Sequence, residues 1–593
     1  MSSRLAWAGV AAGSAVAAIV FSSLALRIVG PLIFGDEVRY FEAGTSLANG
    51  EGLRVREAPY RFGPVYPAVI ALVLAIVEDR LLAYQVLLFL NGLLVASSAI
   101  PVFLLARRLL TPKSAAIVAL ASLVLPVSVF AAFVMTECLA YVAALWAIFA
   151  MQLALERPTI GRQVACLGAC AVATAIRPQL VTLFGAFLLA LAVRYVVSGS
   201  RWSLRRVVQQ LSPTGVALIA AAIALARIAD DPSSVAVFGA YGDLWGRYEA
   251  VEVARWAAYH AFDLALYLML VPVLVIPAAL AHLVRLSRRG GRGDAAFASV
   301  FVAAVSVQLG VMALFSTTPG GGARLHDRYA IYIVPLWLVL LTAWIASGAP
   351  RTRVTAGGGI ALLITILALG PFRQVTETNP PVDQVGTVLW ARVDETVGHG
   401  RPLLFVAATA AILAFLLLRA RRAWALLAVV VVGVSLSSGE MWAWATRADG
   451  LDGATDPRAA SRLWIDRAVG DHSGVFGVYV GTRTCDPEGV RNAFLVSEMF
   501  NASVGPVTSI GSSLGFLPEL QAHLGDDGGL LDQKGEPLVA KYVLVPAGVE
   551  VDGRPIASGT GASLVLWRVN GPIRLRGSTT LAAIESAVCG AGH

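Results

Sequence analysis

The chain consists of long apolar stretches separated by short polar segments. Residues 5–29 form the first stretch, and it is long enough to cross a bilayer, which takes about 20 apolar residues. Further apolar runs follow at 81–106, 115–134, 139–155, 164–176, 180–197, 216–228, 264–284, 295–315, 330–345, 354–369, 402–418 and 423–444. Together they predict about thirteen membrane-spanning helices. The run 64–77 is short for a span, and we expect it either along the membrane interface or as a re-entrant segment.

Basic residues in the loops predict the orientation in the membrane. If the N-terminus is cytoplasmic and 64–77 does not cross, all the basic loops fall on the cytoplasmic side, as the positive-inside rule requires. Their cations are Arg107, Arg108 and Lys113; Arg157 and Arg162; Arg201, Arg205 and Arg206; Arg285, Arg288, Arg289 and Arg292; Arg351 and Arg353; and Arg419, Arg421 and Arg422. We therefore expect a cytoplasmic N-terminus and an extracytoplasmic C-terminal region.

Composition agrees with a multi-pass protein of the cell (inner) membrane. Hydrophobic residues make up 57% of the chain, charged residues 14%, and the mean hydropathy is +0.72, values that exclude an ordinary soluble protein. The net charge of +8 lies mostly in the loops, so it does not indicate a nucleic-acid partner. Arginine carries most of it, a bias typical of GC-rich bacterial genomes.

Beyond residue 445 the pattern is that of a soluble domain. Residues 446–593 hold no further run long enough to span; 459–469 predicts a helix, and 474–480, 542–545 and 563–567 predict strands. The expected fold class is therefore an α-helical polytopic membrane protein with a small extracytoplasmic α/β domain. Its transmembrane module covers 1–445, with a first external loop at 30–64. Cys485 and Cys589 can form a disulfide if the C-terminal domain is outside the cytoplasm.

Carboxylates and arginines gather at the expected outer face. Asp36 and Glu37 follow the first span, Glu137 and Arg177 lie in later outer loops, and Arg328 follows a glycine-rich segment. Charges are costly beside a membrane, so they predict a functional site. Plainer interpretations stay open: Asp36 and Glu37 can cap a helix N-terminus, Glu137 can be a solvated loop residue, and the arginines can reach lipid headgroups.

The order of these motifs resembles a known family. The motifs are Asp36-Glu37 in the first outer loop, a Tyr/Pro segment from Tyr60 to Pro67, Thr136-Glu137, Arg177-Pro178, and Arg328-Tyr329 followed by Pro335. Over residues 5–340 this arrangement resembles the polytopic GT-C glycosyltransferases. The nearest types by pattern are the family 39 protein O-mannosyltransferases, the aminoarabinose transferases and the RgtA/B/C/D-like enzymes.

The resemblance implies transfer of a monosaccharide from a polyprenyl-phosphate carrier to an acceptor at the outer face, with inversion. Asp36 matches the family's catalytic acidic position, and the reaction needs a base for the acceptor hydroxyl. Glu37 and Glu137 are expected to support it, either by orienting Asp36 or by binding the acceptor. A divalent metal ion held by Asp36 and Glu137 stays open.

Cations are expected at the phosphate of the donor. Arg177 and Arg328 are the candidates, since guanidinium groups suit phosphate oxygens, with Tyr329 and His326 beside them. Tyr60 and Tyr66 are expected to contact the substrate. His326 is equally well explained as an ordinary loop residue.

The expected partners are a polyprenyl-phosphate sugar donor, membrane lipid, and an acceptor that is a glycan, a lipid or a protein. The alternative from another class is a transporter or flippase of lipid-linked sugars. Transporters more often show internal repeats and charges at the middle of the membrane, whereas here the charges lie at one face. A non-catalytic scaffold protein with the same fold is a third interpretation.

Overall fold

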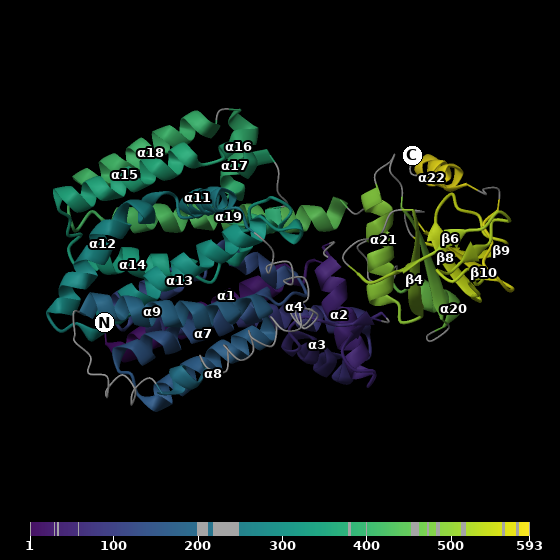
Figure 1. Cartoon of the computed structure of the whole chain (residues 1–593), viewed down its shortest axis with the longest axis horizontal. Coiled ribbons are helices and arrows are strands. Elements are labelled where there is room, and N and C mark those ends of the chain that lie inside the picture. The colour runs from purple at the N-terminus through teal and green to yellow at the C-terminus, as the bar shows by residue number, and fades with distance from the viewer. Residues whose placement is uncertain are drawn as a thin grey trace.

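A computed structural model of the chain shows a helical bundle with a strand-containing domain at one end (Figure 1). It describes residues 2–28, 30–32, 35–56, 58–198, 212–217, 248–377, 381–398, 400–451, 462–470, 474–481, 487–511, 517–559, 564–576 and 580–591. The N-terminus lies at the end of the bundle opposite that domain (Figure 1).

Eight helices in the described part of the chain are long and apolar enough to cross a membrane. They are α1 (Ser3–Ala25), α4 (Arg80–Ser97) with α5 (Ala99–Ala106), α7 (Glu137–Glu156), η2 (Pro178–Val181) with α9 (Thr182–Ser198), α12 (Val271–Arg288), α13 (Arg292–Ser316), α18 (Gly400–Leu417) and α19 (Trp424–Leu451). Shorter helices complete the bundle: α3 (Val65–Ile76), α8 (Ile160–Ile176), α11 (Ala250–Tyr267), α14 (Val334–Ala346), α15 (Arg353–Leu369), α16 (Phe372–Glu377) and α17 (Val388–Val397). The chain is a multi-pass membrane protein, as expected. The count of about thirteen spans stays a prediction, and most of the run 216–228 lies outside the described residues.

One expected span, 115–134, is bent. Helix α6 (Pro112–Ser122) and the 3-10 helix η1 (Pro126–Ala132) meet at an angle of 50°. Pro126 has no N–H group, and Leu125 before it is extended, which ends the α-helix at this point. Residues 133–136, between η1 and α7, are not helical. The Val134 N–H therefore has no partner within a helix and donates to a side chain from another segment.

The first outer loop folds into α2 (Gly35–Ala48), a hairpin of β1 (Arg54–Val55) and β2 (Ala58–Pro59), and then α3. Helix α2 packs closely on α3, because a Cβ atom at Gly44 would come within 2.4 Å of Ile70. Gly50 follows α2 with φ of 78°, a left-handed conformation that suits glycine and turns the chain into the hairpin.

The C-terminal domain contains a six-stranded mixed sheet in the order β5-β4-β3-β8-β10-β9. The strands are β3 (Val475–Gly481), β4 (Val504–Gly511), β5 (Leu520–Gln521), β8 (Tyr542–Pro546), β9 (Gly553–Ser558) and β10 (Leu564–Val569); β6 (His523–Leu524) and β7 (Leu530–Leu531) form a separate pair. Strand β3 runs parallel to β4 and β8, and β10 runs antiparallel to β8 and β9.

Helices cover both faces of this sheet, so its central strands are apolar on both sides. In β8, Val543 and Val545 join the core beside α22 (Leu581–Ala591), whereas Leu544 joins the core beside α20 (Trp464–Val469) and α21 (Pro487–Phe500). The expected strands at 474–480, 542–545 and 563–567 correspond to β3, β8 and β10.

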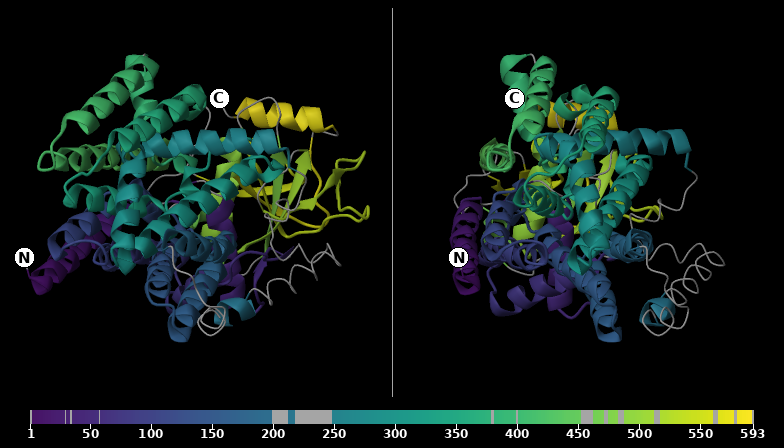
Figure 2. Two further views of the ribbon diagram at one scale, coloured as in Figure 1. Left: turned by 60° about the vertical axis from the view of Figure 1, so that its left-hand side comes forward. Right: turned by 90° about the vertical axis from the view of Figure 1, so that its left-hand side faces the viewer.

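The domain also lies to one side of the bundle in the left view of Figure 2. Its expected start at residue 446 falls inside α19, and that boundary stays a prediction. Cys589 is disulfide-bonded, whereas Cys485, with which pairing was expected, lies outside the described residues.

Candidate active site

Helix α2 begins at the two acidic residues that the sequence singles out. Asp36 and Glu37 lie in its first turn, where helix N–H groups favour carboxylates, so the capping interpretation describes their position correctly. The Asp36 side chain is 25% exposed and forms an ion pair of 2.9 Å with Arg39 one turn later. The Arg39 guanidinium also lies 4.8 Å from the centre of the Phe62 ring. A reachable carboxylate therefore has a cation directly beside it.

Glu37 points inward, away from solvent. Its carboxylate is fully buried and accepts bonds from the Leu32 N–H at 3.0 Å, the Val134 N–H at 2.8 Å and the Tyr84 hydroxyl at 3.2 Å. Burial raises the pKa of Glu37 to about 7. Glu37 thus ties α2 to α4 and to the chain after η1, and this geometry favours orienting Asp36 over contacting an acceptor.

Glu37 makes the stability of the fold depend on pH. Its pKa is about 7 in the native state against an ordinary 4.5, so between these values the native protein holds a proton that the unfolded chain has released. Stability therefore falls as the pH rises through this interval. Glu37→Gln removes this titration. Between about pH 5 and 7.5 the free energy of unfolding of the variant is expected to fall less than that of the wild type, by up to about 3 kcal/mol.

Unfolding in detergent at several pH values measures this slope. Glu395→Gln, at an exposed carboxylate, serves as the control and should keep the wild-type slope. If Glu37→Gln also keeps it, Glu37 does not carry the raised pKa.

Three tyrosines, Tyr40, Tyr60 and Tyr66, pack together near Asp36. Tyr40, on the same helix, contacts Tyr60 and Tyr66 edge-on at ring-centre distances of 6.4 and 5.9 Å. Tyr60 is half-buried and its hydroxyl donates to the Gly63 carbonyl at 3.2 Å. Tyr66 is buried and bonded to Asn91. Both expected substrate contacts therefore lie next to the candidate site, with Tyr60 the more accessible.

Glu137 and Arg177 meet as a buried ion pair. Glu137 is the first residue of α7, and Pro178 ends α8 so that Arg177 is extended, with φ of −143°. The Arg177 guanidinium also lies 3.3 Å from the Thr136 hydroxyl and stacks 5.4 Å from the centre of the Tyr329 ring. Glu137 is buried, which excludes the interpretation as a solvated loop residue.

Arg328 contacts the same ring. Its guanidinium is 5.2 Å from the centre of Tyr329, and its Nε atom is 3.1 Å from Asp383 Oδ1. Arg324 pairs with the second oxygen of Asp383 at 3.2 Å, and its side chain is 36% exposed. One buried carboxylate thus holds two guanidinium groups that come from the same loop.

The neighbours of Arg328 hold the loop in place. Both carboxylate oxygens of Asp327 accept backbone N–H groups at 2.8 Å, one from Val385 and one from Gly386, which fixes the segment that carries Asp383. His326 is buried, lies 2.9 Å from the Gly321 carbonyl through Nε2, and stacks on Tyr329.

His326 has no positive charge to offer a phosphate. Burial, together with the nearby Arg328 charge, lowers the pKa of His326 to about 3, so its ring is neutral at neutral pH. A neutral ring can contact a phosphate only as a hydrogen-bond donor, and the phosphate contact of His326 stays a prediction beside the alternative of an ordinary loop residue.

The charged side chains of Asp36, Glu137, Arg177 and Arg328 lie within electrostatic range of shared neighbours. Burial and then the charge of Asp36 raise the pKa of Tyr40, while the Arg177 charge lowers it, so Tyr40 lies within range of both. The charges of Glu137 and Arg177 also act on Arg328. The structure thus brings α2, the start of α7, the end of α8 and the 3-10 helix η5 (Asp327–Tyr329) to one place. It adds Arg39, Arg324 and Asp383, which sequence reasoning missed.

The expected metal ligands each face a guanidinium group. Asp36 is paired with Arg39 and Glu137 with Arg177. Within the described residues, no group of three or more His, Cys, Asp or Glu side chains is placed to hold a metal ion.

The fold of the chain is similar to that of two solved structures, which confirms the expected fold class. In particular, the chain is similar to the crystal structure of ArnT, an aminoarabinose transferase, from Cupriavidus metallidurans in the apo state, with a TM-score of 0.50 and 16% identity over 95% of this chain and 98% of that one. For the structure of ArnT bound to undecaprenyl phosphate the TM-score is 0.51, with 17% identity over 93% and 97%. No protein-family model and no curated protein matches the sequence.

Proposed function

We propose that this protein is a membrane glycosyltransferase that moves a monosaccharide from a polyprenyl-phosphate carrier to an acceptor. The observation that carries the proposal is the partly exposed Asp36 carboxylate with Arg39 beside it and Arg177 and Arg328 nearby. The GT-C fold supports it, since one structure with this fold holds undecaprenyl phosphate.

In the proposed reaction Asp36 accepts the proton of the acceptor hydroxyl. The acceptor oxygen then attacks the anomeric carbon of the sugar while the bond from that carbon to the phosphate oxygen breaks, and the polyprenyl phosphate leaves with the bonding electron pair. Attack opposite the leaving group inverts the anomeric centre. Guanidinium groups stabilise the negative charge that develops on the phosphate.

The arginines near the candidate site differ in how many of their N–H donors remain available for that phosphate. Arg177 is buried against Glu137, so we assign it mainly the role of orienting Tyr329 and its surroundings. Arg328, Arg324 and Arg39 are each held by one carboxylate and retain further N–H donors. We propose these three as the phosphate contacts, with Arg328 the most firmly positioned.

Asp383 should control donor binding through the two guanidinium groups that it holds. Replacing Asp383→Asn removes the charge that orients Arg324 and Arg328, so the donor KM is expected to rise about tenfold with a smaller change in kcat. Steady-state kinetics on the purified protein in lipid measures this. Asp552→Asn, at an exposed ion pair of the C-terminal domain, is the control. An unchanged KM would remove Asp383 from donor binding.

We place the candidate site at the extracytoplasmic face. Helix α2, which carries Asp36, lies at the end of the bundle next to the C-terminal domain, opposite the N-terminus (Figure 1). Arg108, from one of the expected cytoplasmic loops, pairs with Glu156 at the end of α7. Arg351, from another of these loops, donates to the carbonyls of Leu416 and Leu418 at the end of α18. The positive-inside rule supports a cytoplasmic location for these arginines.

Bond cleavage separates this proposal from the flippase alternative. Vesicles with the protein and a synthetic polyprenyl-phosphate monosaccharide labelled in the sugar should lose the labelled lipid to an acceptor. A flippase would move the intact lipid between leaflets and leave the sugar–phosphate bond unbroken. Translocation without cleavage, in the presence of acceptor extracts, would reject the transferase proposal.

A further inference from the structure

The C-terminal domain contacts the first outer loop through a buried ion pair. Arg56, at the turn of the β1–β2 hairpin, contacts both carboxylate oxygens of Glu498 in α21, at 2.6 and 2.8 Å. Its remaining terminal nitrogen donates to the Pro518 carbonyl at 2.6 Å. The two side chains are only 6% and 2% exposed. A bidentate pair shielded from water in this way holds its partners in one geometry.

The same end of α21 packs against α4. Arg80, the first residue of α4, donates to the Met499 carbonyl at 3.3 Å, and the Phe500 ring meets Tyr84 edge-on at 5.6 Å. The Tyr84 hydroxyl in turn donates to Glu37, next to Asp36. A chain of direct contacts therefore runs from the C-terminal domain to the start of α2.

Glu42 adds a second connection from α2. Burial, then the charge of Glu498, raises the pKa of Glu42 to about 7, while the charges of Arg80 and Arg56 lower it. The middle of α2 therefore lies within range of the same charges that join the hairpin to α21. Helix α2 is held at its first turn through Tyr84 and at its middle beside the ion pair.

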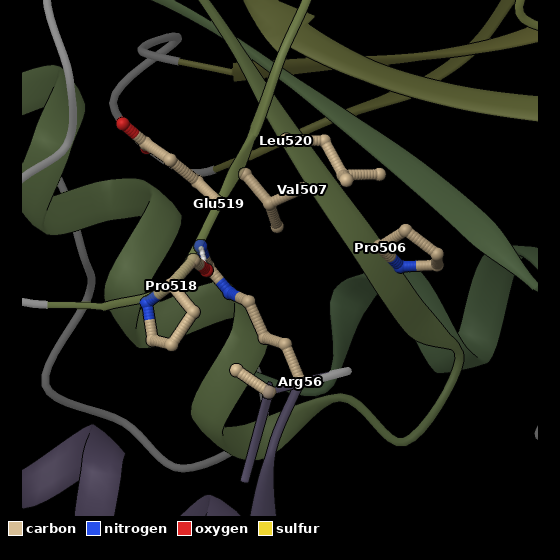
Figure 3. Close-up of a pocket in the computed structure, with 7 residues that line it drawn as sticks. Arg56, Pro506, Val507, Pro518, Glu519 and Leu520 are labelled. Atoms are coloured by element: carbon tan, nitrogen blue, oxygen red, sulfur yellow. Dashed lines mark hydrogen bonds between the residues drawn. The ribbon is translucent and has the colours of Figure 1, made fainter. Parts of the chain in front are cut away.

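The interface beside the ion pair is hollow. A pocket of about 260 Å³ lies between the hairpin and the sheet, and it is lined by Arg56, Ala58, Pro506, Val507, Pro518, Glu519 and Leu520. Figure 3 shows the Arg56 side chain reaching toward Pro518 along this pocket. Apolar side chains do not fill this part of the interface, whereas Leu495, Val496, Met499 and Phe500 of α21 pack into the core of the bundle nearby.

We propose that the C-terminal domain positions the catalytic carboxylate. On this view the Arg56–Glu498 pair and the Phe500–Tyr84 contact hold α2 at the angle that presents Asp36. The proposal rests on the proposed glycosyltransferase function. Arg56 and Glu498 are positioning residues, because neither belongs to the cluster of groups assigned to the reaction.

Kinetics of Arg56→Gln, Glu498→Gln and Arg56→Lys test the proposal. Both glutamine variants are expected to lower kcat by about tenfold or more and to change the donor KM by less than about twofold, since the donor contacts remain. Arg56→Lys keeps the charge but loses the bidentate geometry, so it should recover part of the activity. Arg576→Gln, which removes an exposed ion pair with Asp552 in the same domain, is the control and should match the wild type.

Hydrogen exchange of the α2 amides gives a readout that needs no activity. The glutamine variants should exchange at least about tenfold faster over 35–48, with the six-stranded sheet unchanged. Wild-type kcat in both glutamine variants, or wild-type exchange in α2, would overturn the proposal. So would faster exchange spread evenly over the sheet with no recovery in Arg56→Lys, because this would mean that the pair only stabilises the domain. If the wild type turns over no donor at all, the proposed function fails, whereas the exchange comparison still decides whether the pair holds α2.

Discussion

Asp36→Asn is expected to lower sugar transfer by a factor of about 10² to 10⁴ while the protein stays folded. The substitution keeps the size of the side chain and removes the group that takes the acceptor proton. Asp36 is partly exposed and its ion pair with Arg39 lies at the surface of the candidate site, so the fold does not depend on its charge. Single-turnover kinetics with saturating donor measure the loss directly.

Donor affinity and a matched control variant distinguish loss of the base from loss of donor binding. Asp36→Asn should bind the donor at least as well as the wild type, because removing the carboxylate leaves Arg39 available for the phosphate. Glu51→Gln, at an exposed carboxylate just after α2, should keep full activity. An Asp36→Asn protein with wild-type turnover would mean that the base is another group.

Arg328→Ala is expected to reduce kcat/KM by about 10² to 10³, with an increase in KM for the donor as well as a decrease in kcat. The guanidinium is held by Asp383 and Tyr329, so it is already oriented before the donor binds. It can therefore stabilise the negative charge that develops on the phosphate as the sugar–phosphate bond breaks. The variant also leaves the buried Asp383 with only Arg324 as a cationic partner. Steady-state kinetics over a range of donor concentrations separates the two parameters.

Two companion variants locate the origin of that effect. Arg328→Lys keeps the charge but lacks the planar fork, so it should recover only part of the lost activity. Arg392→Ala, which removes an exposed arginine from a surface ion pair, should behave as the wild type. Equal kinetics of Arg328→Ala and the wild type would exclude a role at the phosphate.

The apolar pattern predicted most of the membrane part of the fold. Runs such as 81–106, 139–155 and 295–315 correspond to helices in the structure, because a span must be continuously apolar and must bond its backbone internally. The run 115–134 contained its own exception in Pro126, which bends the helix. In the C-terminal domain the apolar pattern predicted β3, β8 and β10, whereas β4, β5 and β9 of the same sheet were not predicted.

Adjacent side chains show why the candidate site was predicted only in part. Asp36 and Glu37 are neighbours on a helix, where successive residues point about 100° apart, so one can face the site and the other the interior. The sequence alone did not say which. Glu37 proved to be the inward one because Leu32, Val134 and Tyr84, from three separate segments, supply its bonds.

Long-range partners were the other missing part. Asp383 lies far along the chain from Arg328, and no spacing rule links residues in separate loops. Arg39 is a different case, since it follows Asp36 by three residues, a spacing that allows an ion pair once the segment is known to be a helix. Each residue expected to bind substrate or support catalysis stays a prediction until it is tested.

The most direct test of the account is mass spectrometry of the lipid products after the purified protein in bilayers is mixed with polyprenyl-phosphate monosaccharides and an acceptor extract. We expect free polyprenyl phosphate to accumulate together with a glycosylated acceptor, and we expect Asp36→Asn to form neither. Intact donor in every reaction, or equal product from wild type and Asp36→Asn, would contradict the account.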